Sequence, residues 1–334
     1  MGPMSDGSAV HRVGISHRDE FDGALERGEL ILHYQPQVDL STGVVVGAEA
    51  LLRWEHPIGG LLPPDEFLPA VAHTPLMPKL TDWVVASASA IAVEWDGSAA
   101  VAVNIAASDA VRAGLVSSVR ETLARTGLPA GRLTLEITEH ALVHDLARAT
   151  RNLRLLVDDG VRVSLDDFGT GYSSLLYLKE LPIHEIKIDR AFTAGIGNDQ
   201  DDEAIVAGVI RLGHAIGLRV VAEGVESREQ AELLAQLGCD IAQGFWFGRP
   251  EETFAVPATP PVPVNARPPR RNRAPRRPPE SIAALSAQNV IRSMVADGAS
   301  LHTIAAVLNR QGIHTTYGSR WVAATVARAV TELS

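Results

Sequence analysis

Two adjacent carboxylates, Asp166 and Asp167, follow an apolar stretch with the character of a buried strand. Two like charges so close together repel each other and each favours water, so the pair is unusual at the end of such a strand. A divalent cation would remove the repulsion. Because neighbouring side chains on an extended chain point to opposite sides, the pair could reach two ions, or one ion and its water. Gly169 and Gly171 would let the backbone fold tightly over that site. The stretch therefore predicts either a metal site or an Asp-Asp turn followed by a flexible glycine loop.

The other predicted strands also bring polar side chains to their C-terminal ends. In chain order the set is Glu49, Asn104, Glu136, Asp166 with Asp167, Lys187 with Asp189, Glu223 and Gln243. In a barrel of parallel strands those ends meet at one mouth, where enzymes of this architecture keep their chemistry. Any one of these acids alone is as consistent with a solvated loop. Glu136 and Asn104 are not, because each lies in an apolar strand, where an unpaired polar group costs about 1 to 3 kcal/mol.

The residue types in this set indicate the chemistry. Four or five carboxylates with an amide and no cysteine form an oxygen-rich site, which favours one or two Mg²⁺ or Mn²⁺ ions over zinc or copper. Lys187 adds a positive charge. Such a site suits a phosphate ester whose charge is held by metal and lysine while a metal-bound water attacks.

The elements that must position these residues alternate between strand and helix. The first two predicted strands, 30–40 and 44–54, are joined too tightly for anything but an antiparallel hairpin. The later strands are predicted at 101–105, 133–137, 161–165, 185–188, 219–222 and 241–242, and the helices at 80–94, 108–126, 145–159, 173–181, 203–216 and 227–237. This alternation predicts an α/β fold whose parallel sheet closes into a barrel. An open doubly wound sheet is the alternative, but no Gly-x-Gly-x-x-Gly turn follows the first strand.

The composition is that of a globular protein. Of the 334 residues 46% are apolar, so most of the chain can bury a core. Cys239 is the only cysteine, which excludes an internal disulfide and cysteine-rich zinc sites. We find no signal peptide and no apolar run of about 18 residues, so a soluble cytoplasmic protein with no membrane partner is expected.

The charge is divided unevenly along the chain. Residues 1–260 carry a balance of −17 and residues 261–334 a balance of +7. The acidic part suits metal binding, whereas the basic part suits a polyanion or the acidic part itself. We expect a flexible N-terminus over 1–17, a Pro/Arg-rich linker over 251–280 and a small helix-turn-helix-like unit of three helices over 281–334.

The spaced motifs together carry a family resemblance. They are Glu49-Ala50-Leu51, Val103-Asn104-Ile105, Glu136-Ile137-Thr138-Glu139, Asp166-Asp167-Phe168-Gly169-Thr170-Gly171, Lys187-Ile188-Asp189, Glu223-Gly224-Val225-Glu226 and Gln243-Gly244-Phe245. Over residues 18–250 the chain resembles the EAL-domain family, phosphodiesterases that linearise the bacterial second messenger cyclic di-GMP to pGpG on a modified TIM barrel. The resemblance implies the same fold and activity here.

The resemblance also implies a role for each matching residue. Glu49, Asn104, Glu136 and Asp166 would hold the first metal, and Asp166 would bridge to a second metal that Asp167 also binds. Lys187 would position or polarise the attacking water, and Glu223 would be the general base or a second-metal ligand. Gln35 and Arg53 would contact the substrate's phosphate or guanine, Gln243 would support the water and metal site, and Glu139 would anchor the loop at 167–174. In the family that loop lies near a dimer interface, so a homodimer is expected. Tyr172, Phe245 and Trp246 are expected to pack in the core rather than to hold guanine.

Two further functions stay open. The first is a cyclic di-GMP receptor with little turnover that signals through the C-terminal unit, although relatives of that kind usually lose metal ligands or the residue matching Glu223. The second is a DNA-binding regulator governed by the nucleotide. Residues 300–330 are similar to a small helical segment in the recombinase region of large serine recombinases, which implies at most DNA contact. A module that docks onto the barrel or onto a protein partner is equally consistent with them.

Overall fold

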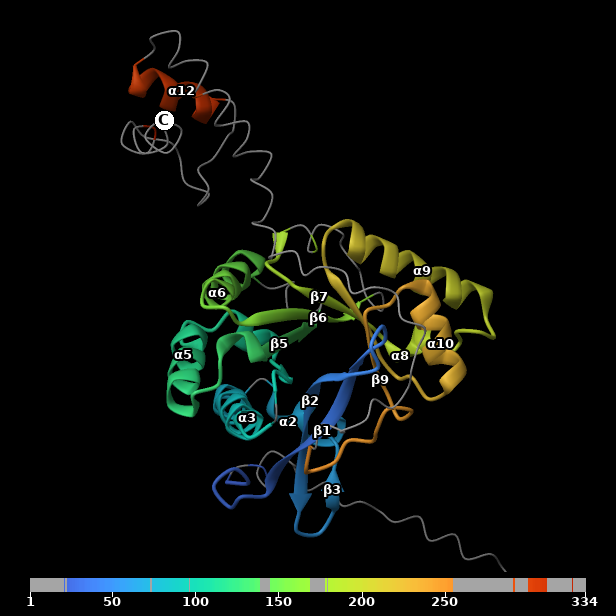
Figure 1. The fold of residues 1–334 in the computed structure, drawn as a ribbon. Helices are drawn as coiled ribbons and strands as arrows, with labels where there is room; N and C mark the ends of the chain where they lie inside the picture. The colour runs from blue at the N-terminus through green and yellow to red at the C-terminus, as the bar shows by residue number, and fades with distance from the viewer. Residues whose placement is uncertain are drawn as a thin grey trace, which may run out of the picture. The chain divides into compact units, whose positions relative to one another are not determined.

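The computed structural model describes residues 21, 23–72, 74–95, 97–138, 145–168, 178, 180–254, 291, 300–310 and 326 (Figure 1). The chain divides into two compact units, residues 1–271 and 272–334, and each is described by itself. Of the site residues predicted from the sequence, Glu139 lies outside the described residues.

The first unit contains a closed barrel of strands. The barrel strands are β1 (Leu30–Asp39), β2 (Val45–His56), β4 (Ala100–Asn104), β5 (Leu133–Thr138), β6 (Arg162–Phe168), β7 (Glu185–Ile188), β8 (Arg219–Ala222) and β9 (Ile241–Gln243). Neighbours are bonded in the order β1-β9-β8-β7-β6-β5-β4-β2, and β1 also pairs with β2, which closes the sheet. The short strand β3 (Gly60–Leu62) pairs only with the outer end of β2. The predicted α/β barrel is confirmed.

The first strand is antiparallel to both of its neighbours, whereas all other barrel pairs are parallel. The tight turn at 39–43 explains this. Asp39 Oδ1 accepts hydrogen bonds from the backbone amides of Ser41 and Thr42, and Gly43 takes a left-handed φ of 71°. No crossover helix fits into so short a connection, so β1 folds back on β2. The C-terminal ends of the parallel strands then meet at one mouth.

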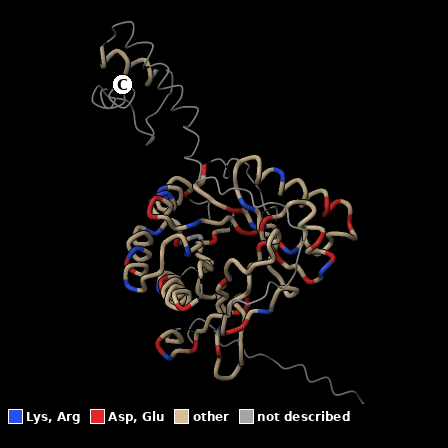
Figure 2. The backbone as a smooth tube through the Cα atoms, in the orientation of Figure 1, with Lys and Arg blue, Asp and Glu red and all other residues tan. Residues whose placement is uncertain are grey.

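Helices surround this barrel (Figure 1). They are α2 (Pro64–Val71), α3 (Leu76–Val93), α4 (Ala107–Ala110), α5 (Leu115–Thr126), α6 (Leu146–Asp158), α8 (Arg190–Thr193), α9 (Gln200–Ala215) and α10 (Arg228–Leu237). Figure 2 shows acidic and basic residues distributed along these outer helices. The helix predicted at 108–126 is divided into α4 and α5. Asn152 Nδ2 donates hydrogen bonds to the carbonyl oxygens of Ala110 and Arg112. In a continuous helix these two oxygens would accept hydrogen bonds from backbone amides of the next turn.

Among the described residues, α3 alone is long and apolar enough by composition to cross a membrane, with a mean hydropathy of 1.2 over 18 residues. It nevertheless buries Leu80, Val84, Val85 and Ala88 against the core of the first unit. A core helix of a globular domain has this pattern, so the helix is weak support for a membrane segment.

In the second unit, the described residues include α12 (Leu301–Arg310). Ser300 caps it, since its hydroxyl accepts a hydrogen bond from the Thr303 amide at 3.2 Å. Ile304 and Leu308 are buried, whereas Leu301 is 37% exposed. The remainder of the predicted three-helix unit lies almost wholly outside the described residues.

Candidate active site at the mouth of the barrel

A buried lysine lies at the centre of the predicted cluster. Lys187 comes from β7, and its side chain is only 1% exposed. Its Nζ atom lies 2.6 Å from Glu223 Oε1, 2.8 Å from Glu136 Oε2, 3.3 Å from Asp166 Oδ1 and 3.4 Å from Glu49 Oε2. These four acids come from strands β2, β5 and β6 and from the end of β8. The structure therefore brings together five residues that are as many as 174 positions apart in the sequence.

The surroundings change the protonation of these groups. Burial opposes the charge of Lys187, but the carboxylates of Asp166, Glu136, Glu223 and Glu49 outweigh it and raise the pKa of the ammonium well above its usual value. Burial raises the pKa of Glu136 well above its usual value, and the neighbouring charge of Glu49 raises it further. Burial also raises the pKa of Glu223 to about 8, against the opposing effect of Lys187.

Glu49 is the acid with the most hydrogen-bond donors in this cluster. Asn104 Nδ2 donates to Glu49 Oε1 at 2.7 Å, and Gln243 Nε2 donates to Glu49 Oε2 at 2.6 Å. Although burial opposes its ionisation, the charge of Lys187 and these hydrogen bonds lower the pKa of Glu49. This carboxylate is consequently held ionised and in one orientation. Asn104 is exposed at the mouth, not buried as expected.

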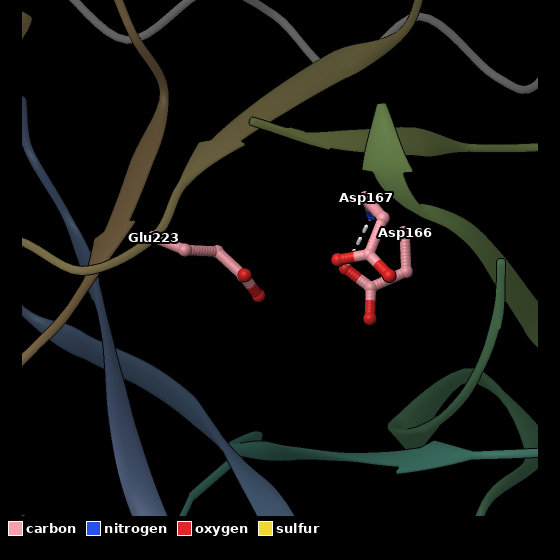
Figure 3. Close-up of side chains that lie close together, drawn as sticks. All are labelled: Asp166, Asp167 and Glu223. Carbon is pink, nitrogen blue, oxygen red and sulfur yellow. Dashed lines mark hydrogen bonds between the residues drawn. The ribbon is translucent and has the colours of Figure 1, made fainter. Parts of the chain in front are cut away.

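The side chains of Asp166 and Asp167 face that of Glu223 across the mouth of the barrel (Figure 3). Ligand oxygens of Asp166, Asp167 and Glu223 lie within 4.8 Å of one another. A simple extended strand would point the two aspartates to opposite sides. Instead the pairing of β6 with β7 shifts register between Leu165 and Phe168, and Asp167 has a φ of 55°. The irregularity turns both carboxylates toward the same space, and the Asp167 amide donates to Asp166 Oδ1 at 3.0 Å.

The residues fit a divalent metal. One carboxylate oxygen of Glu136, Oε1, is buried and makes no hydrogen bond with the residues that the structure describes. An unpartnered buried carboxylate oxygen is costly, and a cation would remove that cost. The donor set contains carboxylates and one amide, which are the ligands preferred by Mg²⁺ and Mn²⁺. Asp166, Asp167 and Glu223 form a second group on the same side, which leaves room for one ion or two.

The structure supports some of the remaining predictions for single residues and contradicts others. Gln35 belongs to the same polar network, because its Oε1 accepts from Gln243 Nε2 at 3.0 Å. Arg53 donates to the Leu52 carbonyl at 2.8 Å, and burial lowers the pKa of its guanidinium. Asp189 caps α8 by accepting from the Ala191 amide at 2.8 Å. Phe245 and Trp246 are 48% and 40% exposed, so the expectation that they pack in the core is wrong.

The structure adds one residue that the sequence analysis missed. Gln37 is 7% exposed, and its Nε2 donates to Gln243 Oε1 at 3.0 Å. It stands two positions after Gln35 on β1, so both side chains share one face of the strand. The spacing of two residues between Gln35 and Gln37 in a predicted strand could have indicated that Gln37 faces the site.

Gly224, which follows Glu223, provides a test of how rigid the site must be. Its φ is 67°, and a Cβ added there would lie 2.4 Å from Arg190 Cβ. Gly224→Ala should therefore destabilise the protein by about 2 to 4 kcal/mol through backbone strain and overpacking, as measured by urea unfolding. A shift of Glu223 by about 1 Å should also lower the expected phosphodiesterase activity by about 100-fold.

Gly217→Ala is the matched control for this glycine. Gly217 has a φ of 84°, but an added Cβ there would meet no atom within 4 Å. It should cost about 1 to 2 kcal/mol and leave activity unchanged. Equal losses of stability in the two variants would contradict the close contact between Gly224 and Arg190.

Known proteins are similar to this chain over the residues that form the barrel. Residues 18–250 match the EAL domain family. The chain is 48% identical over 231 residues to the bifunctional diguanylate cyclase/cyclic di-GMP phosphodiesterase MucR of Pseudomonas aeruginosa, a match of 68% of this chain and 34% of that protein. It is 40% identical over 230 residues to the signaling protein YkoW of Bacillus subtilis, with 68% of this chain and 29% of that protein covered. The chain spans about a third of the length of such curated relatives.

Solved structures are similar over the same region. The structure of the MucR phosphodiesterase in complex with c-di-GMP matches with a TM-score of 0.67 and 45% identity, covering 70% of this chain and 97% of that one. The FimX EAL domain from Pseudomonas aeruginosa bound to c-di-GMP matches with a TM-score of 0.66 and 25% identity, covering 71% and 97%.

The family match ends at residue 250, and the resemblance of 300–330 to a recombinase-region segment gains no support from it. Over the matched residues, the family match and the similarity to solved structures agree with the barrel fold. The chain belongs to the EAL-domain family.

Proposed function

We propose that this chain is a metal-dependent phosphodiesterase that hydrolyses cyclic di-GMP to linear pGpG. The observation that carries the proposal is the cluster around Lys187, in which Glu49, Glu136, Asp166 and Glu223 each place a carboxylate oxygen within 3.4 Å of its Nζ. Support also comes from the similarity to the MucR phosphodiesterase, whose structure contains c-di-GMP.

EAL domains generally depend on divalent metals, and the chain offers the ligands. Glu49, Asn104, Glu136 and Asp166 would hold one ion, and Asp166 and Asp167 a second, with Glu223 as the general base or as a further ligand of that second ion. When bound, Mg²⁺ or Mn²⁺ would supply Lewis-acid polarisation of the phosphate and a more acidic water. Gln243 holds the Glu49 carboxylate in its orientation through the 2.6 Å hydrogen bond.

The residues around the ions would perform the hydrolysis as follows. Gln35 and Arg53 would contact the phosphate or guanine of the substrate. Lys187 would orient the attacking water and Glu223 would accept its proton. The water oxygen would form a bond to one phosphorus while that phosphorus loses its bond to a ribose 3′ oxygen, which would take up a proton from solvent. The product is linear pGpG with a 5′ phosphate and a free 3′ hydroxyl.

The deciding measurement is chromatographic. Purified protein is incubated with cyclic di-GMP and Mg²⁺ or Mn²⁺, beside Glu49→Ala and a chelator control. Metal-dependent pGpG that is absent from both controls is the expected result. No product, together with tight nucleotide binding by calorimetry, would instead make the chain a receptor, although its full set of site residues disfavours that function.

Several sequence predictions accompany this proposal. They are a cytoplasmic location, a homodimer, the domain boundaries at 17, 250 and 280, a loop-anchoring role for Glu139, and a DNA or protein partner for 281–334 that does not involve a membrane. DNA binding can be measured by gel shift at several salt concentrations, where the lack of salt-sensitive binding at micromolar protein would count against it.

A further inference from the structure

Three glutamines form a buried chain of hydrogen bonds beside the metal-binding cluster. Gln37 Nε2 donates to Gln243 Oε1 at 3.0 Å, and Gln243 Nε2 donates to Gln35 Oε1 at 3.0 Å as well as to Glu49 Oε2 at 2.6 Å. Gln35 Nε2 donates in turn to the Gly248 carbonyl at 3.1 Å. All three amides are less than 9% exposed, so water competes little for these bonds.

The ends of the chain determine the orientation of each amide. A backbone carbonyl and an ionised carboxylate can only accept hydrogen bonds, so the amide nitrogens of Gln35 and Gln243 must face Gly248 and Glu49. The Gln243 oxygen must then face away from Glu49. Among the hydrogen bonds of the described residues, the donor to that oxygen is Gln37, which is paired with Gln243 in the antiparallel register of β1 and β9.

Rotating the Gln243 amide by half a turn would break this arrangement. Its oxygen would then face Glu49 Oε2 and Gln35 Oε1, two acceptors, and its nitrogen would face the nitrogen of Gln37. The hydrogen bond donated by Gln37 thus favours the amide orientation of Gln243 in which its nitrogen donates to the Glu49 carboxylate. Without this donor, the buried Gln243 oxygen would lose its partner.

The chain also reaches the loop after β9. Gln35 holds the Gly248 carbonyl, and Pro36 Cγ would lie 2.9 Å from a Cβ added at Gly248, so the loop sits directly on β1. This loop carries the exposed Phe245 and Trp246, and Arg249 lies 4.2 Å from the Phe245 ring centroid. One row of amides therefore links the ligand Glu49 to an exposed aromatic loop.

We propose that Gln37 is a positioning residue of this active site: its amide donor fixes the orientation of Gln243 and, through it, of the metal ligand Glu49 and of Gln35. The inference deepens the proposed function and rests on it for the identity of the ligands. Replacing a direct hydrogen-bond partner of a metal ligand, here Gln243, typically changes metal affinity by about 10- to 100-fold, and Gln37 acts through that partner.

Two isosteric variants separate this role from simple packing. Gln37→Met keeps the volume and removes the donor, whereas Gln37→Glu places an acceptor against Gln243 Oε1 and favours the rotated amide. We expect the affinity for Mn²⁺, measured by calorimetry without nucleotide, to fall by about 10-fold in Gln37→Met and by about 100-fold in Gln37→Glu. The side-chain amide signal of Gln243, assigned by its absence in Gln243→Met, should shift in both.

Asn152→Leu is the control for lost stability. Asn152 is buried and makes two hydrogen bonds to backbone carbonyls on α4 and just beyond it, away from the cluster. That variant should be destabilised without a change in Mn²⁺ affinity. The inference is overturned if Gln37→Met behaves in the same way, whatever Gln37→Glu does. Failure of the proposed function has a different signature, namely no pGpG from the wild-type chain, and it leaves the metal-affinity comparison valid.

Discussion

Replacing Lys187 with methionine should abolish hydrolysis and make stability strongly dependent on divalent metal. Lys187 is 1% exposed and places its positive charge within 3.4 Å of four carboxyl groups. Removing one partner from a buried ion pair leaves uncompensated charge and costs about 3 to 5 kcal/mol. Part of this cost will be relieved by protonation of Glu136 and Glu223, whose pKa values burial already raises.

The measurement is urea unfolding with a chelator and with millimolar Mg²⁺. A cation that binds the native state stabilises it by an amount that grows with the logarithm of its affinity, and the variant lacks the competing ammonium. Mg²⁺ should consequently stabilise Lys187→Met more than it stabilises the wild-type chain, even though the variant forms no pGpG. Lys79→Met serves as the control, because Lys79 is exposed on α3 and should change neither quantity. An equal response to Mg²⁺ in wild type and Lys187→Met would contradict the neutralising role of this lysine.

Asp166→Asn should lower the rate of hydrolysis by about 100- to 1,000-fold while the chain stays folded. Asp166 lies 3.3 Å from Lys187 and also belongs to the second group, with Asp167 and Glu223. An amide of the same shape keeps the packing but removes the charge that would be shared by two cations. Loss of a charged group at the centre of an active site typically costs about 3 to 4 kcal/mol in the transition state, which corresponds to this change in rate.

Asp199→Asn is the matched control, because Asp199 caps α9 by accepting from the amides of Asp201 and Asp202, and asparagine is an equally good cap. Turnover of cyclic di-GMP and Mn²⁺ affinity are measured on both variants. Weakened Mn²⁺ binding in Asp166→Asn alone is the expected pattern. If Asp166→Asn retains wild-type turnover, the bridging role is wrong.

Much of this site could be predicted from the order of residues. In a parallel barrel the C-terminal ends of the strands face one mouth, so a polar residue near the end of an apolar strand is predicted to lie at that mouth. This argument located Glu49, Glu136, Asp166, Lys187 and Glu223, and the structure gathers all five. The hairpin at 39–43 was equally predictable, because the turn is too short for a crossover helix.

The tertiary structure decided the features that depend on long-range contacts. The register shift in β6 turns Asp167 beside Asp166, against the alternation of a regular strand. Asn152, which comes from another helix, divides the segment predicted as one helix at 108–126. The exposure of Trp246 likewise depends on how the loop after β9 lies on β1.

The sequence by itself determined the barrel, the mouth and the residue types that meet there, because strand periodicity and strand-end chemistry are local properties. It did not determine which donor faces which acceptor. The link from Gln37 to Gln243 spans 206 positions, and only closure of the barrel between β1 and β9 brings the two amides to 3.0 Å. Hydrogen bonds act over about 3 Å, so their pattern is decided by the folded backbone.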